Sequence, residues 1–105
     1  MPTDFRSVNI TLPDGTGTKT IPAVVTFGSA VQSADTAVKS FFFDYDSDDH
    51  HINVVEATTG VRAIQGNTVT VAANARYADR NFDDAYTGQV TVLVIAQVAL
   101  LANPV

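Results

Sequence analysis

The sequence predicts an all-β fold, a small antiparallel β-sandwich of about six to seven strands. Three observations support this prediction. Apolar and polar residues alternate with a period of two in several segments, clusters of Gly, Pro, Asn and Asp separate these segments, and no helical spacing of apolar residues persists. Because 105 residues is a usual length for one domain, we expect residues 1–105 to form a single sandwich.

Two strands are predicted before residue 28. The first has alternating apolar residues and ends at the turn residues 13–17; its apolar positions are Val8, Ile10 and Leu12. The second covers Thr18–Phe27. Because Pro22 has no N–H to donate to a neighbouring strand, we expect this second strand at a sheet edge or at a bend.

The third predicted strand, Ala37–Tyr45, contains four aromatic residues. Strict alternation puts Phe41, Phe43 and Tyr45 on one face of the strand. Phe42 and Val38 are then on the other face. The preceding residues 28–39 allow one or two helical turns. The acidic residues 44–49 after this strand are expected to form the loop of a hairpin.

Further strands are predicted at residues 52–57, 61–64 and 68–75. The Thr58-Thr59-Gly60 and Gln65-Gly66-Asn67 clusters separate them. Residues 76–86 are polar and aromatic without a clear period, so we expect a long connection there.

The last predicted strand, Val90–Leu101, is the most distinctive feature because both of its faces are largely apolar. A strand in a two-layer sandwich normally exposes one face to water, so the second face needs a cover. That cover is either another chain or a loop folded over the strand, and another chain is the simpler one for a single small domain. We therefore expect a homo-oligomer, such as a trimer, with an interface that includes Val92, Leu93, Val94 and Ile95.

The composition excludes several kinds of partner. Charged residues form only 16% of the chain, against ~25% in typical soluble domains, which suits a surface covered by other subunits. The net charge is −5 and the six basic residues are scattered, which argues against a nucleic-acid partner. The apolar segment 90–101 is shorter than the ~20 residues of a membrane-spanning helix, so no membrane span is expected.

Candidate catalytic and metal-binding groups are few. There is no cysteine and no G-x-S-x-G motif, and His50 and His51 are adjacent, so we expect no enzyme activity. The spacing of Asp44, Asp46 and Asp48 matches the first three oxygen ligands of a calcium loop. The sixth and twelfth positions of such a loop do not match. The sequence therefore suggests a non-standard calcium or magnesium site at Asp44, Asp46 and Asp48, and a solvated acidic loop is the alternative.

Aromatic residues near the predicted loops offer a second kind of site. Rings at loop positions stack on sugars in many binding proteins, but they also cap cores and fill subunit contacts. The residues concerned are Tyr45, Tyr77, Phe82 and Tyr86.

The order of the strands resembles one known family. Over residues 24–98 the chain resembles the H-type lectin domain. The segments that carry the resemblance are, in order, Val25-Thr26-Phe27, Phe43-Asp44-Tyr45-Asp46, His51-Ile52-Asn53-Val54, Val69-Thr70-Val71 and Val92-Leu93-Val94-Ile95-Ala96. The resemblance implies a six-stranded antiparallel sandwich that forms trimers through one sheet. It also implies binding of N-acetylgalactosamine-type sugars between subunits. The positions that it suggests for such a ligand are Asp46, Asp48, His50, Arg80 and Tyr86.

From the sequence we expect a non-enzymatic structural or adhesion subunit of a larger assembly, such as a virion or phage surface, decoration or tail component. The cysteine-free, lysine-poor composition, rich in Thr, Val, Ala and Asp, is typical of such particle proteins. The alternative is a free oligomeric lectin that binds glycans. A third hypothesis is a small enzyme that uses the acidic loop with a metal ion. Fold analogy alone does not separate adhesion from architecture.

Overall fold

The computed structural model describes residues 2–45, 54–78 and 85–99. Six strands contain most of them, and this part of the chain has no helix. The strands are β1 (Thr3–Gly15), β2 (Lys19–Thr26), β3 (Val31–Tyr45), β4 (Val54–Gln65), β5 (Thr68–Ala78) and β6 (Tyr86–Val98). All strand pairs are antiparallel. The prediction of a small all-β sandwich is confirmed.

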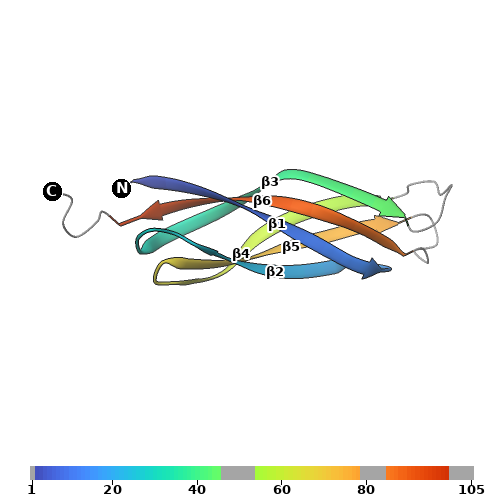
Figure 1. The fold of residues 1–105 in the computed structure, drawn as a ribbon, viewed down its shortest axis with the longest axis horizontal. Coiled ribbons are helices and arrows are strands. Elements are labelled where there is room, and N and C mark those ends of the chain that lie inside the picture. Colours follow the sequence, from blue (N-terminus) through green and yellow to red (C-terminus); the bar gives the residue numbers. More distant parts are fainter. Residues whose placement is uncertain (1, 46–53, 79–84, 100–105) are drawn as a thin grey trace.

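The strands form two three-stranded sheets, with the orders β1-β6-β3 and β2-β5-β4 (Figure 1). Central strand β6 pairs with two strands that are distant in the sequence, whereas central strand β5 pairs with distant β2 and, through a tight hairpin, with the preceding strand β4. The Cα atoms span 60 × 18 × 16 Å, and the radius of gyration is 16.6 Å. A compact chain of this length would have a radius of gyration of about 13 Å. The domain is therefore a narrow rod.

The core lies between the two central strands. Alternate residues of β6 and β5 point inward and are fully or almost fully buried; they are Val90, Val92, Val94, Ala96 and Val98 on β6, and Val69, Val71, Ala73 and Ala75 on β5. Ile10, Leu12 and Phe27 extend this core. Each buried valine contributes about 1.5–3 kcal/mol through the removal of apolar surface from water.

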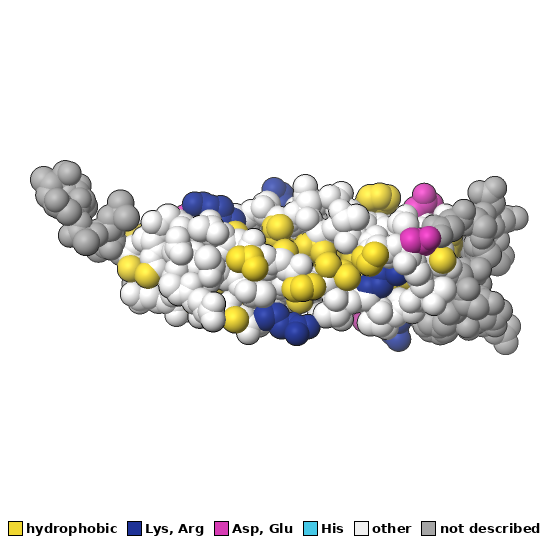
Figure 2. All heavy atoms as spheres, turned by 60° about the horizontal axis from the view of Figure 1, so that its bottom comes forward, with side chains coloured by type: hydrophobic (Ala, Val, Ile, Leu, Met, Phe, Trp, Pro, Cys, Tyr) yellow, Lys and Arg dark blue, Asp and Glu magenta, His cyan; other side chains and the backbone are white. Residues whose placement is uncertain are grey.

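The two long sides of the rod differ. Strands β3 and β4 approach each other along more of their length than β1 and β2 do. On the β3–β4 side, the hydroxyls of Thr36 and Thr59 form a 2.8 Å hydrogen bond between the sheets. On the other side, the guanidinium of Arg6 lies 5.1 Å from the ring centroid of Phe27. Figure 2 shows apolar side chains that reach the surface along the middle of the rod, next to basic ones.

Several boundaries differ from those that the sequence predicts, among them the end of β1 at Gly15 and the end of β6 at Val98. Residues 31–39 belong to β3 and not to a helical turn, since Ala34, Thr36 and Val38 are partly buried at every second position. Strand β4 is continuous through Thr58-Thr59-Gly60, because β5 pairs with all three residues. Strand β5 extends to Ala78 and β6 begins at Tyr86, so the connection expected at residues 76–86 is shorter.

The predicted faces of β3 are wrong, because a β-bulge changes which of its side chains point toward the core. The register with β6 shifts between Val38 and Ser40, which leaves Lys39 as an extra residue. Val38 therefore faces the core on the same side as Phe43, although strict alternation puts them on opposite faces. Pro22 lies in β2, an edge strand, as the sequence predicts.

Candidate interaction surface

The outward side of the β1-β6-β3 sheet, here called the outer face, is centred on β6. Because side chains alternate along a strand, Leu93 and Ile95 point outward while their neighbours point into the core. Ile95 lies between Phe5 of β1 and Asp35 of β3, and Leu93 lies between Ser7 and Ala37; these register positions come from the two strand pairings. A cluster of apolar side chains therefore crosses all three strands.

Two aromatic side chains of the outer face are strongly exposed. Phe5 is 55% exposed and Phe42, farther along β3, is 56% exposed, whereas Leu93 and Ile95 are half-buried by their neighbours. Large apolar side chains at these exposures retain unfavourable contact with water, which a partner would remove.

Polar contacts surround the apolar cluster. The Lys39 ammonium donates a 3.3 Å hydrogen bond to Ser7 Oγ across β6. Thr91 donates a 2.8 Å bond to Asn9 on one side of the cluster, and the Gln97 amide donates a 3.0 Å bond to the Thr3 hydroxyl on the other. An apolar centre with a polar rim is the usual composition of a protein–protein interface.

The four residues that the sequence assigns to an interface divide into two pairs. Val92 and Val94 are 0% exposed and pack between the sheets of their own chain, so a partner cannot reach them. Leu93 and Ile95 are on the outer face. The predicted interface is thus narrowed to Leu93 and Ile95, because a two-residue period separates the faces of the strand. Phe5 joins them, and sequence reasoning missed it. Phe42 is also on the outer face, but it is opposite Gln89 and lies beyond the Thr91–Asn9 bond that bounds the cluster.

The outer side of the other sheet is less apolar. Its outward residues include Thr20, Thr26, Thr58, Thr68 and Thr70. Val24, 63% exposed, is the large apolar residue there. Glu56 and Arg76 form an ion pair at 3.6 Å, with both side chains partly exposed. Among the described residues, this side has no apolar cluster comparable to that around Leu93 and Ile95.

An aromatic cluster fills the end of the sandwich where β3 and β5 finish. The ring of Tyr77 stacks on Phe43 at a centroid distance of 5.2 Å and lies 4.5 Å from that of Tyr45. Tyr86 contacts Phe43 edge to face at 6.0 Å. Tyr45 and Tyr77 remain partly exposed. These rings cap the core and leave part of their area open to a ligand.

Tyr86, one of the predicted ligand residues, is fully buried in this cluster. Its hydroxyl donates to the carbonyl oxygens of Gly17, at 2.7 Å, and Ala75, at 3.3 Å. The Lys19 ammonium lies 4.5 Å from its ring centroid. Burial raises the pKa of Tyr86, and a backbone hydrogen bond from Tyr77 partly offsets this rise. These contacts support the fold, and the side chain is not accessible to a ligand.

The other predicted ligand and metal residues are mostly outside the described residues. This applies to Asp46, Asp48, His50 and Arg80. Asp44 is exposed on the outer face, opposite Thr87 of β6. Within residues 2–45, 54–78 and 85–99, no group of three or more His, Asp or Glu side chains could hold a metal ion. The calcium site therefore stays a prediction.

Comparison of the chain with family models, curated proteins and solved structures gave no match. Over the described ranges, no helix has the length and apolarity needed to cross a bilayer. We therefore infer function from the shape of the domain and the chemistry of its surfaces.

Proposed function

We propose that this chain is a non-enzymatic structural or adhesion subunit of a larger assembly, such as the surface of a virion or a similar particle. The observation that carries the proposal is the apolar cluster of the outer face, where Leu93 and Ile95 lie beside the exposed ring of Phe5. An enzyme would need converging polar groups, whereas this surface offers apolar side chains with a polar rim.

The size of the outer face fits a contact between subunits. Three strands ~4.8 Å apart, over about 11 residues at ~3.4 Å each, give roughly 500 Å² per chain. Two such faces bury roughly 1,000 Å², near the lower limit for a specific interface. The rod shape also favours assembly, since a narrow rod exposes more surface for its mass than a compact domain does.

Substitutions on adjacent residues of β6 test the proposal. Ile95→Asp puts a charge on the outer face and should remove the subunit contact while the chain still folds. Val94→Asp puts the charge into the core and should abolish folding. Thr58→Asp, on the outer side of the other sheet, is the matched control and should leave assembly unchanged.

The measurement is mass by light scattering at several concentrations, with thermal melting followed by circular dichroism. Wild-type protein should exceed 11.1 kDa by a whole-number factor, and Ile95→Asp should reduce that factor. Wild-type protein that is monomeric at every concentration would refute the proposal. So would an Ile95→Asp variant that assembles as the wild type does.

Carbohydrate binding is the second candidate function, and the partly exposed rings of Tyr45 and Tyr77 favour it. Adjacent exposed rings are the groups that stack on sugar faces. A glycan array should then show saturable binding that Tyr45→Ala weakens, with Phe42→Ala on the outer face as the control. Binding that is absent, or that Tyr45→Ala leaves unchanged, would reject this candidate.

A further inference from the structure

The four edge strands of the sandwich are not equally protected. A free strand edge pairs with other chains unless a proline, a bulge or a charge interrupts it. Pro22 interrupts β2. A β-bulge with a charged extra residue interrupts each of β3 and β4, and these residues are Lys39 and Arg62. Strand β1 keeps an unbroken register with β6 from Thr3 to Leu12. From Ser7 to Leu12 this strand has no proline, no bulge and no charged residue.

Hydrogen bonds show which backbone groups of β1 lie along this edge. The Val98 N–H donates to the Pro2 carbonyl oxygen at 3.0 Å, so even-numbered residues bond to β6. The Phe5 N–H donates instead to the Asp4 side chain at 2.9 Å. In an antiparallel pair, hydrogen-bonded and non-bonded positions alternate. The N–H and C=O groups of Ser7, Asn9 and Thr11 therefore point away from β6.

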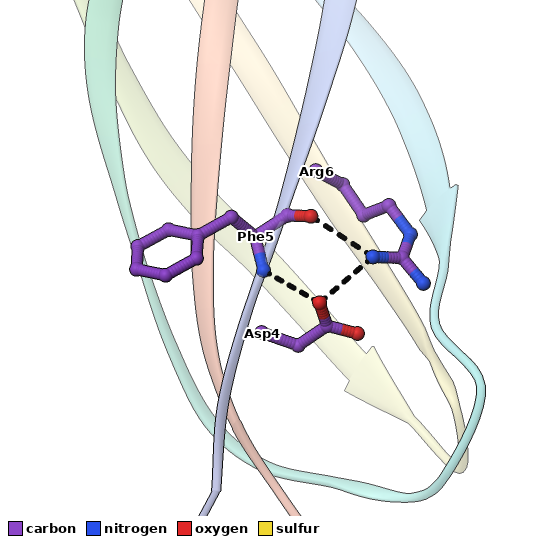
Figure 3. Close-up of polar contacts among 3 residues, drawn as sticks. All are labelled: Asp4, Phe5 and Arg6. Atoms are coloured by element: carbon purple, nitrogen blue, oxygen red, sulfur yellow. Dashed lines mark hydrogen bonds and ion pairs between the residues drawn. The ribbon is translucent and has the colours of Figure 1, made fainter.

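Side chains block the first part of the edge. Asp4 Oδ1 accepts from the Phe5 N–H, and the Arg6 guanidinium donates to the Phe5 carbonyl oxygen at 2.9 Å (Figure 3). The same guanidinium forms a 2.9 Å ion pair with Asp4. At the other end, the register shifts between Leu12 and Gly15. The open part of the edge is therefore limited to residues 7–11.

This open segment, Ser7-Val8-Asn9-Ile10-Thr11, is nearly palindromic in residue type. If two copies pair antiparallel with Asn9 on a two-fold axis, Ser7 lies opposite Thr11 of the second copy and Val8 lies opposite Ile10. Hydroxyl pairs and pairs of β-branched residues are favourable across strands. The three outward-pointing residues of each copy then form about six backbone hydrogen bonds. The pairing also covers Val8, which its own core leaves partly exposed.

We propose that β1 pairs with β1 of a second copy through residues 7–11, which gives a two-fold dimer with one continuous six-stranded sheet, β3-β6-β1-β1-β6-β3. The near-palindrome favours a second copy over an unrelated peptide, because a two-fold contact requires self-complementarity. This contact is at the edge of the sheet and is separate from the outer face.

Cysteine cross-linking tests the pairing and its register, since the natural chain contains no cysteine. At Asn9 the two Cα atoms of the dimer would be about 5.5 Å apart, within the range for a disulfide. At Ser7 the two equivalent atoms would be about 14 Å apart. Mild oxidation of Asn9→Cys should therefore give a covalent dimer of twice 11.1 kDa, and Ser7→Cys should give none. Absence of the Asn9→Cys dimer, or equal cross-linking of both variants, would overturn the proposal.

These variants are made in the Ile95→Asp background, so that failure of the outer-face contact does not affect the result. A second test is Asn9→Pro, which removes an N–H group that the fold itself does not use. It should convert the edge dimer to monomer in light scattering without loss of cooperative melting. Val24→Pro, at an exposed position on the β2 edge, is the control and should remain dimeric. A dimeric Asn9→Pro protein would contradict the proposal, and if that variant fails to fold, the cysteine pair decides.

Discussion

The hydroxyl of Tyr86 donates a 2.7 Å hydrogen bond to the carbonyl oxygen of Gly17, which joins the first residue of β6 to the turn between β1 and β2. Gly17 has a φ of 79°, a conformation that favours glycine. Lys19 follows this turn and places its ammonium over the Tyr86 ring. One buried side chain therefore holds the turn that connects its own sheet to the other sheet.

Tyr86→Phe should lower the free energy of unfolding by about 1–2 kcal/mol, because it removes the hydroxyl and leaves the Gly17 and Ala75 carbonyl oxygens without this donor. Chemical denaturation measures the loss. Thr20→Val, which removes an exposed hydroxyl bonded to Asn74, is the control and should change stability by less than about 0.5 kcal/mol. Equal effects of the two substitutions would show that the buried bond has no special role.

Stability should also depend on pH through Tyr86. Its pKa in the folded protein is raised above its ordinary value of 10.0, so the folded state holds this proton more tightly than the unfolded state. The contribution is complete below pH 10.0 and is lost as the pH rises through the folded pKa. Melting temperatures measured at increasing alkaline pH should therefore fall more steeply for wild type than for Tyr86→Phe. Parallel curves would contradict this prediction.

Gly88→Ala should destabilise the domain by about 3 kcal/mol. A Cβ atom at Gly88 would overlap the carbonyl oxygen of Phe42 and lie 2.9 Å from Cδ1 of Phe43. Gly60 of β4 is the matched control, since nothing lies within 4 Å of a Cβ placed there. Gly60→Ala should be neutral or stabilise by about 0.5–1 kcal/mol. Thermal melting of both variants decides, and similar shifts would mean that β3 can move away from Gly88.

The hydroxyl pair between the sheets should show coupling. Thr36→Val or Thr59→Val alone leaves one partly buried hydroxyl without its 2.8 Å partner and should cost about 1 kcal/mol. The double substitution removes both hydroxyls and keeps the shape of the side chains, so its cost should be smaller than the sum. Strict additivity in a double-mutant cycle of unfolding free energies would refute the coupling.

The sequence predicts well where one face of a strand is strongly apolar. The alternating valines of β6 and the Val69–Ala75 stretch of β5 indicate the two central strands, and Pro22 indicates an edge. β1 is harder to delimit. Its start at Thr3 is hidden because Asp4 and Arg6 occupy inward positions, where they hold the backbone of Phe5. Phe5 therefore gives no sign of belonging to an exposed apolar cluster.

Bulges explain other differences between expectation and structure. An extra residue at Lys39 and another at Arg62 reverse the alternation within β3 and β4, and the sequence pattern alone does not place such residues. The burial of Tyr86 depends on partners in β1–β2 and β5 that are far away in sequence. The local sequence pattern predicts that Tyr86 is an aromatic residue near a loop. Its hydrogen bond to Gly17 instead holds the side chain in the core.

The bond between Pro2 and Val98 places the beginning of β1 next to the end of β6, opposite the aromatic end of the rod. Force that separates these two points would load the β1–β6 hydrogen bonds one after another, since the bonds of an antiparallel pair lie across the strands. Force between Thr3 and Tyr86, at opposite ends of the same pair, would load them together. The domain should therefore open like a zipper in the first direction and resist as a mechanical clamp in the second.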